Sequence, residues 1–154
     1  RRGLRALAAH EEILRDQLSA LAQAAAGSDA IVQVMAPMVS TAQEAQYFRD
    51  LAHELGIAIA GVMVEVPSCA ILADHVAQHA DFMSIGTNDL TQYTLAADRL
   101  LGTVATFQNP WHPSVLRLIE TVGSAGAAHD VPVGICGEAA ADPLDTIRRL
   151  LVVS

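Results

Sequence analysis

The stretch DFMSIGTNDLTQYTLAADR, residues 81–99, changes within a few residues from an apolar segment into a polar Gly-Thr-Asn-Asp turn. Residues 81–86 are predicted to form a strand, and Asp89 follows directly after it. In α/β enzymes the chemistry lies at the carboxyl ends of parallel strands, which is where such a turn places a carboxylate. The stretch therefore predicts an α/β fold with a polar site at this end of the strand.

Strands and helices alternate along the rest of the chain. Apolar runs predict further strands over residues 30–35, 57–65 and 131–136. Amphipathic or capped segments predict helices over residues 10–26, 41–55, 68–79, 90–97 and 114–129, and a last helix that opens at residues 142–143. Nearly all-apolar strands separated by helices are typical of a parallel sheet covered by helices. Four such units fit an open sheet or half of an eight-stranded (β/α) barrel, and periodicity does not separate the two.

Length and composition narrow the class of protein. The chain has 154 residues, of which 52% are hydrophobic, and this is enough for one domain core. Its formal net charge of −8 argues against binding to nucleic acid, whose phosphates select clustered Lys and Arg. There is no apolar run of membrane-spanning length, and the first residues lack the apolar stretch of a signal peptide. We therefore expect a cytoplasmic protein without membrane insertion.

Two carboxylates follow predicted strands. Glu65 ends the segment 57–65, and Asp89 follows the segment 81–86. If neighbouring parallel strands supply them, both side chains converge at one end of the sheet. Hard oxygen ligands held in this way suit Mg²⁺, which fills its remaining positions with water and substrate oxygens. In the structural alternative, Glu65 caps a helix and Asp89 shapes a turn by bonding to nearby backbone.

Arginine and cysteine side chains supply the other candidates. Arg99 and Arg2 are candidate anion clamps, because a guanidinium binds phosphate or carboxylate through two parallel hydrogen bonds. Taken alone, each Arg is better interpreted as a solvated surface residue. Cys136 ends the strand 131–136 and is either a buried small side chain or a proton donor at the strand end. Cys69 matches no motif and is expected to be structural.

Residues 84–96, SIGTNDLTQYTLA, resemble the second signature of the phosphoenolpyruvate-utilising enzymes. Their form is that of the enzyme I branch, which serves the bacterial sugar phosphotransferase system. The resemblance implies a partial (β/α)8 barrel of the TIM type, in which residues 1–154 are the central part of the phosphoenolpyruvate-binding domain. It also implies that this chain is a fragment, without the domains that carry the phosphorylated His and bind the phosphocarrier protein HPr.

The resemblance assigns a role to each matching residue. Glu65 and Asp89 match positions that bind Mg²⁺, and Asp89 also lies among the substrate-binding positions. Arg99, Arg2 and Asn88 match positions that bind phosphoenolpyruvate. Cys136 matches the Cys that protonates the enolate of pyruvate. In the family, the phosphoryl group passes to an enzyme His and then to HPr, and the full-length protein is expected to be a homodimer.

One position departs from the family, and two other functions stay open. Gln33 stands where the family can carry a basic residue, and its neutral amide adds no charge to hold a phosphate. Pyruvate phosphate dikinase and phosphoenolpyruvate synthase share the barrel and its metal site, although Tyr93 and the Ile-Gly-Thr form of residues 85–87 favour the phosphotransferase branch. The other possibility is a non-catalytic remnant that binds a ligand or an intact partner without chemistry.

Overall fold

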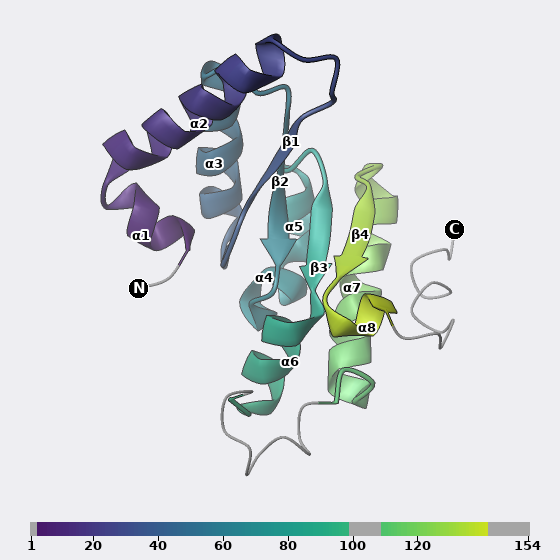
Figure 1. Ribbon diagram of the computed structural model, residues 1–154. Coiled ribbons are helices and arrows are strands. Elements are labelled where there is room, and N and C mark those ends of the chain that lie inside the picture. Colours follow the sequence, from purple (N-terminus) through teal and green to yellow (C-terminus); the bar gives the residue numbers. More distant parts are fainter. Residues whose placement is uncertain (1–2, 99–108, 142–154) are drawn as a thin grey trace.

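The fold centres on one parallel sheet. The computed structural model describes residues 3–98 and 109–141. Its strands are β1 (Gln33–Ala36), β2 (Ile59–Val64), β3 (Met83–Gly86) and β4 (Val133–Cys136), and they lie in the order β1-β2-β3-β4 (Figure 1). Every pairing is parallel, with Val64 opposite Ile85 and Gly86 opposite Cys136. Each strand therefore lies beside the one that precedes it along the chain.

The helices gather on one face and at one end of this sheet. Those in the described residues are α1 (Leu4–Ala8), α2 (Glu11–Ala26), α3 (Ala42–Glu54), α4 (Pro67–Ile71), α5 (Ala73–Ala77), α6 (Thr87–Leu95), α7 (Pro113–His129) and α8 (Glu138–Ala141). In Figure 1, α3, α5 and α7 lie behind the strands, and α6 and α8 lie beyond their carboxyl ends. A doubly wound sheet would carry helices on both faces and reverse its strand order, whereas strands in sequence with helices on one face make a segment of a (β/α) barrel. The prediction of parallel strands alternating with helices in a partial barrel is confirmed.

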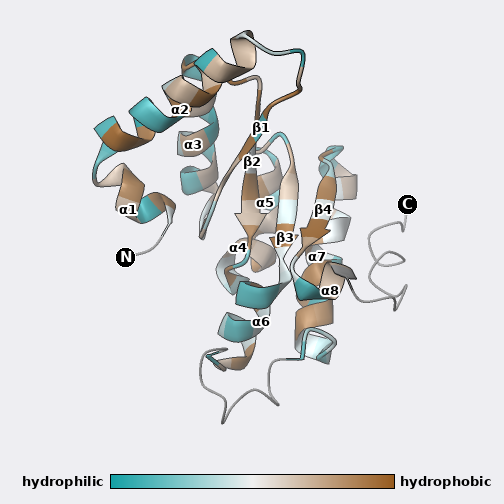
Figure 2. Cartoon of the chain, in the orientation of Figure 1, coloured by the Kyte–Doolittle hydropathy of each residue, from teal (hydrophilic) through white to brown (hydrophobic). Residues whose placement is uncertain are grey.

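The face of the sheet beneath the helices forms the core. Val62, Val64 and Ile85 point into it and are at most 1% exposed. The residues that pack against them from α3 and α7 include Phe48, Leu51, Val115, Ile119 and Val122. Figure 2 shows the strands mostly in brown, the apolar end of the scale, and bands of both colours along α2 and α3. Removing this layer from water holds the helices on this face.

The opposite face of the sheet is open in the described part of the chain. Gln33, Met35 and Gly134 are exposed there. A hollow of about 730 Å³ lies on this side towards the amino ends of the strands, and its lining includes Ile59 and Ser84. This face becomes the interior when a (β/α) sheet closes into a barrel.

Several predicted boundaries are wrong, although the elements themselves are present. The strand predicted from residue 30 begins at Gln33, and the helix predicted over residues 68–79 is divided at Leu72 into α4 and α5. The helix predicted from residue 90 already begins at Thr87. Neither α1 nor α8 was predicted, and the helix expected at residues 142–143 lies outside the described residues. None of the helices described is long and apolar enough to cross a membrane.

Candidate active site

Glu65 lies directly after β2 and is buried, with 4% of its surface exposed. Its Oε1 accepts a hydrogen bond of 2.8 Å from the backbone N–H of Met38. Met38 follows β1 and has a φ of 55°, in the left-handed region that residues other than glycine seldom adopt. The backbone at the end of one strand is thus held in a rare conformation that presents an N–H to the carboxylate at the end of the next.

Asp89 lies in the first turn of α6, which begins immediately after β3. Its carboxyl group lies close enough to that of Glu65 to raise the pKa of Glu65. Burial is the main cause that raises the pKa of Glu65 above its ordinary value, and the Met38 N–H offsets part of this rise. Asp89 adds to it through its charge. The structure therefore places these two predicted site residues side by side, at the ends of adjacent strands.

The Glu65–Asp89 pair has the donor chemistry of a Mg²⁺ site. This ion accepts one or two protein carboxylates and completes its octahedron with water and substrate oxygens. Among residues 3–98 and 109–141, no group of three or more His, Cys, Asp and Glu side chains could hold a metal, as a protein-bound zinc ion requires. Two like charges brought together under burial repel each other, and a divalent cation between them would remove that repulsion. The residues present therefore fit Mg²⁺.

Hydrogen bonds join the start of α6 to the end of β4. The Thr87 hydroxyl donates to the Cys136 carbonyl at 3.0 Å, and Asn88 Oδ1 accepts from the Glu138 N–H at 3.1 Å. Gly137 makes the turn between them with a φ of 94°, and a Cβ there would lie 2.5 Å from Thr87 Oγ1. The Asn88 oxygen is the acceptor in this contact, and the side-chain NH₂ group is the part of Asn88 that can donate to an anion at this end of the sheet.

Cys136 is the last residue of β4 and is only partly buried. Its thiol donates to the Ile85 carbonyl at 3.4 Å, and the Ser84 hydroxyl donates to its sulfur at 3.6 Å. Cys69, by contrast, is fully buried, and burial raises the pKa of its thiol to about 12. Because the reactive form of cysteine is the thiolate, Cys69 is inert at neutral pH. Of the two thiols, only Cys136 has the access and the partners that proton transfer requires.

Gly86 separates the carboxyl pair from this thiol. It ends β3 and lies opposite Cys136 in the register of the sheet. A Cβ on Gly86 would lie 3.1 Å from Glu65 Oε2, so a side chain here would press against the carboxylate. The missing side chain leaves a place with carboxylates on one side and a thiol on the other. This order of groups could hold a metal-bound anion with a reacting carbon turned towards the sulfur.

The two predicted anion clamps, Arg2 and Arg99, lie outside the described residues. Gln33 lies in β1, exposed on the open face of the sheet. Sequence reasoning missed Met38, because a Met residue gives no reason to expect a left-handed backbone conformation. It also missed Ser84, which side-chain alternation along the strand could have placed on the face of Gly86.

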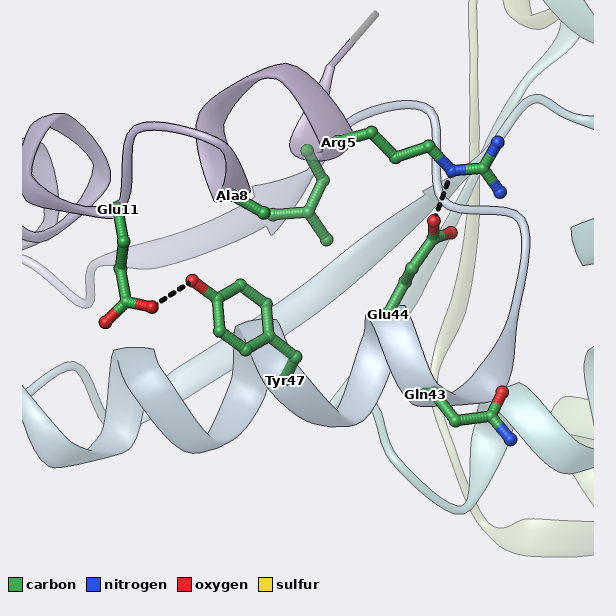
Figure 3. A pocket seen from close by; sticks show the side chains of 7 residues that line it. Arg5, Ala8, Glu11, Gln43, Glu44 and Tyr47 are labelled. Carbon is green, nitrogen blue, oxygen red and sulfur yellow. Dashed lines mark hydrogen bonds and ion pairs between the residues drawn. The ribbon is translucent and has the colours of Figure 1, made fainter. Parts of the chain in front are cut away.

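A second hollow, of about 290 Å³, lies between α1, α2 and α3 (Figure 3). Its lining residues are Leu4, Arg5, Ala8, Glu11, Gln43, Glu44 and Tyr47. The Arg5 Nε group donates to the Glu44 carboxylate, and the Tyr47 hydroxyl donates to Glu11 at 3.1 Å. Because these charged groups pair with one another, we assign the hollow no ligand.

Comparison with known proteins matches nearly the whole chain. Residues 1–153 match the family model described as PEP-utilising enzyme, PEP-binding domain. A phosphoenolpyruvate-protein phosphotransferase from Streptomyces coelicolor is 50% identical over 93% of this chain and 26% of its own length. Its counterpart from Listeria monocytogenes serovar 1/2a is 39% identical over 92% of this chain and 26% of its own length.

A related protein has a different name. A multiphosphoryl transfer protein from Rhodobacter capsulatus is 40% identical over 93% of this chain and 18% of its own length. The chain therefore spans about a quarter or less of the relatives that it matches. Among solved structures, an HpcH/HpaI aldolase from Desulfitobacterium hafniense DCB-2 matches with a TM-score of 0.48 and 16% identity, over 69% of this chain and 50% of the other. A likeness of this size says nothing about function.

Proposed function

The chain belongs to the PEP-utilising enzymes, matching their PEP-binding domain over residues 1–153, and we propose that it binds phosphoenolpyruvate with Mg²⁺ as part of an enzyme I-type phosphotransferase. Two relatives at 50% and 39% identity that bear the name phosphoenolpyruvate-protein phosphotransferase support this branch of the family. The observation that carries the proposal is the arrangement of Glu65 and Asp89 on one side of Gly86 and Cys136 on the other. Residues 1–154 would then be the central part of the substrate barrel.

In this proposal Glu65 and Asp89 hold the metal, with water and substrate oxygens as the other ligands. Bound Mg²⁺ would supply positive charge against the phosphoryl group and the enolate oxygen. The Met38 N–H keeps the Glu65 carboxylate oriented, since it binds Oε1 and leaves Oε2 on the side of Gly86. The metal would therefore lie at the carboxyl ends of β2 and β3.

Substrate binding needs groups that neutralise phosphate and carboxylate. The Asn88 NH₂ group would donate a hydrogen bond to the phosphate, while the Asn88 oxygen accepts from the Glu138 N–H. Arg99 and Arg2 would supply the positive charges, as their matching positions in the family imply. Gln33 would contribute a neutral amide at most, so this chain would bind phosphate with one positive charge fewer.

The proton donor in this proposal is Cys136. Once the phosphoryl group has left phosphoenolpyruvate, the enolate of pyruvate needs a proton on its terminal carbon, and the thiol would donate it as a general acid. The phosphoryl group would go to a His and then to HPr. Because the relatives are about four times as long as this chain, we place that His and the HPr-binding region outside these residues. We expect the full-length protein to be a homodimer.

Titration calorimetry of phosphoenolpyruvate into the purified chain tests the proposal. We expect heat of binding that requires Mg²⁺ and an affinity that falls about tenfold or more, a loss of at least about 1.4 kcal/mol, in Glu65→Gln and in Asp89→Asn. Asp74→Asn is the matched control, because Asp74 is an exposed carboxylate on α5. Binding of phosphoenolpyruvate that does not require Mg²⁺, or an affinity that is the same in the parent chain and in both variants, would contradict the proposed site.

A further inference from the structure

The thiol of Cys136 has a hydroxyl neighbour on the adjacent strand. Ser84 lies in β3, and side-chain alternation places it on the same face of the sheet as Gly86 and Cys136. Its Oγ lies 3.6 Å from the Cys136 sulfur and donates a hydrogen bond to it. The residue opposite Ser84 in β4 is Gly134, which contributes no side chain to the space between hydroxyl and sulfur.

We propose that Ser84 is a positioning residue for Cys136: its hydroxyl fixes the sulfur at the end of β4 and stabilises the thiolate left after proton transfer. The proposal rests on the proposed function of Cys136 as the proton donor. Without such a partner the thiol would keep, among the residues that the structure describes, one hydrogen bond: the Ile85 carbonyl accepts its proton at 3.4 Å and draws that proton towards the sheet. Ser84 is the contact that remains when the proton turns away from Ile85 to the substrate.

The proton-transfer step shows why the hydroxyl matters more after the transfer than before it. The S–H bond breaks, the proton forms a C–H bond at the terminal carbon of the enolate, and the enolate oxygen becomes the ketone oxygen of pyruvate. The electron pair of the S–H bond stays on sulfur, and the thiolate later takes a proton from water. Ser84 keeps its own proton throughout and donates it to the sulfur. Because a hydrogen bond to a charged acceptor is stronger than one to a neutral acceptor, this contact strengthens as the proton leaves and lowers the barrier.

The reverse reaction isolates this step. A thiolate that accepts a proton from the methyl group of pyruvate exchanges that group's hydrogens with solvent, and the exchange needs no phosphoryl donor. We would therefore incubate the full chain with pyruvate and Mg²⁺ in D₂O and follow the methyl signal by NMR. Ser84→Thr and Ser84→Val are a matched pair, since their β-branched side chains suit a strand and differ only by hydroxyl against methyl.

We expect Ser84→Thr to keep most of the exchange rate, and Ser84→Val to lower kcat about tenfold with an unchanged KM for pyruvate. The control Ser124→Ala, on the exposed side of α7, should behave as the parent chain does. Cys136→Ala should abolish the exchange. A lower kcat with an unchanged KM indicates a role at the sulfur, whereas a general loss of fold would change both constants. The Ser84→Thr and Ser84→Val variants should also have the same melting temperature.

Each contrary result has its own meaning. If Cys136→Ala keeps the parent rate, Cys136 is not the proton donor, and the proposals for Cys136 and Ser84 both fall. If Cys136→Ala loses exchange while Ser84→Val matches Ser84→Thr, the proposed function stands and the role of Ser84 is overturned. A Ser84→Val variant that melts well below Ser84→Thr and raises KM as much as it lowers kcat would make Ser84 a packing residue, which also overturns its role at the sulfur.

Discussion

Glu65 is the residue at which stability and the proposed function oppose each other. Its carboxyl is buried beside Asp89, and its pKa is raised above the ordinary value of 4.5. The folded chain therefore holds the proton of Glu65 more tightly than the unfolded chain does. Above the raised pKa the ionised carboxylate costs folding free energy, while below 4.5 the group is protonated in both states and the cost disappears.

Glu65→Gln should therefore stabilise the chain when Mg²⁺ is removed by a chelator. We expect a gain on the order of 1 kcal/mol in the free energy of unfolding at neutral pH, and a gain that vanishes as the pH falls towards 4.5. The Gln oxygen can still accept from the Met38 N–H, and its NH₂ group can donate to Asp89. Urea denaturation of the variant and the parent across this pH range measures the difference.

Glu120→Gln, at an exposed position of α7, is the control and should change nothing at either pH. A Glu65→Gln variant that is less stable than the parent at neutral pH would show that favourable contacts of the carboxylate outweigh its burial.

Single residues also mark the limit of what the sequence predicts about the site. Glu65, Asp89 and Cys136 were predicted because each ends or follows an apolar strand. The carboxyl ends of parallel strands lie at one end of the sheet, so residues at these positions are expected to come together. The contacts that orient them come from elsewhere in the chain. Met38 reaches Glu65 from the end of β1, and Ser84 reaches Cys136 across the sheet. Such contacts depend on the assembled fold, so no local pattern contains them.

At the scale of elements, α3 has the best-defined start in the described chain. The Thr41 hydroxyl accepts from the Glu44 N–H at 3.3 Å, and the Glu44 carboxylate accepts in return from the Thr41 N–H at 3.2 Å. The helix was predicted over residues 41–55 as a capped segment, and this capping box is its cap. The same carboxylate also accepts from Ser40 N–H at 2.7 Å and from Arg5, so the cap joins α1 to α3.

Thr41→Ala should lower the free energy of unfolding by about 1 kcal/mol, because it leaves the Glu44 N–H without its acceptor. Thr121→Ala is the matched control, since the Thr121 hydroxyl donates to the Arg117 carbonyl within α7 and caps nothing. Chemical denaturation should show a lower midpoint for Thr41→Ala and little change for Thr121→Ala. Equal losses of unfolding free energy in the two variants would mean that the capping hydroxyl of Thr41 contributes no more to stability than the hydroxyl of Thr121 within a helix.

The start of α6 shows why element boundaries are harder to predict than elements. The polar residues Thr87, Asn88 and Asp89 were interpreted as a turn because such residues favour turns. In the structure they form the first turn of the helix, held by hydrogen bonds from the end of β4 and the start of α8. Those partners lie about fifty residues away in sequence.

At the scale of the whole molecule, helices cover only one face of the sheet in the described residues (Figure 1). In this part of the chain the other face and the outer edges of β1 and β4 have no covering element. The alternation of strands and helices predicted this parallel sheet, but it did not separate an open sheet from a barrel. That distinction came from strand order and from the side on which the crossovers lie, which are properties of the assembled fold.

This half-covered sheet predicts that the chain of 154 residues self-associates. An edge strand offers unpaired N–H and C=O groups to another chain, and Met35 adds an apolar side chain that is 42% exposed on β1. The net charge of −8 opposes association, and salt screens that charge, so association should rise with both protein concentration and ionic strength. Sedimentation velocity over a concentration series, at low and high salt, measures it.

Met35→Lys should shift the chain towards monomer, because a lysine on an edge strand resists pairing with a second chain. Ile13→Lys is the control: Ile13 is 46% exposed, like Met35, but lies on α2 away from the sheet edge, and its substitution should leave the association unchanged. If the parent chain is monomeric at every concentration and melts in one cooperative transition, the open face and edges must be covered by residues of the same chain. Equal effects of the two lysines would instead attribute the association to general surface hydrophobicity.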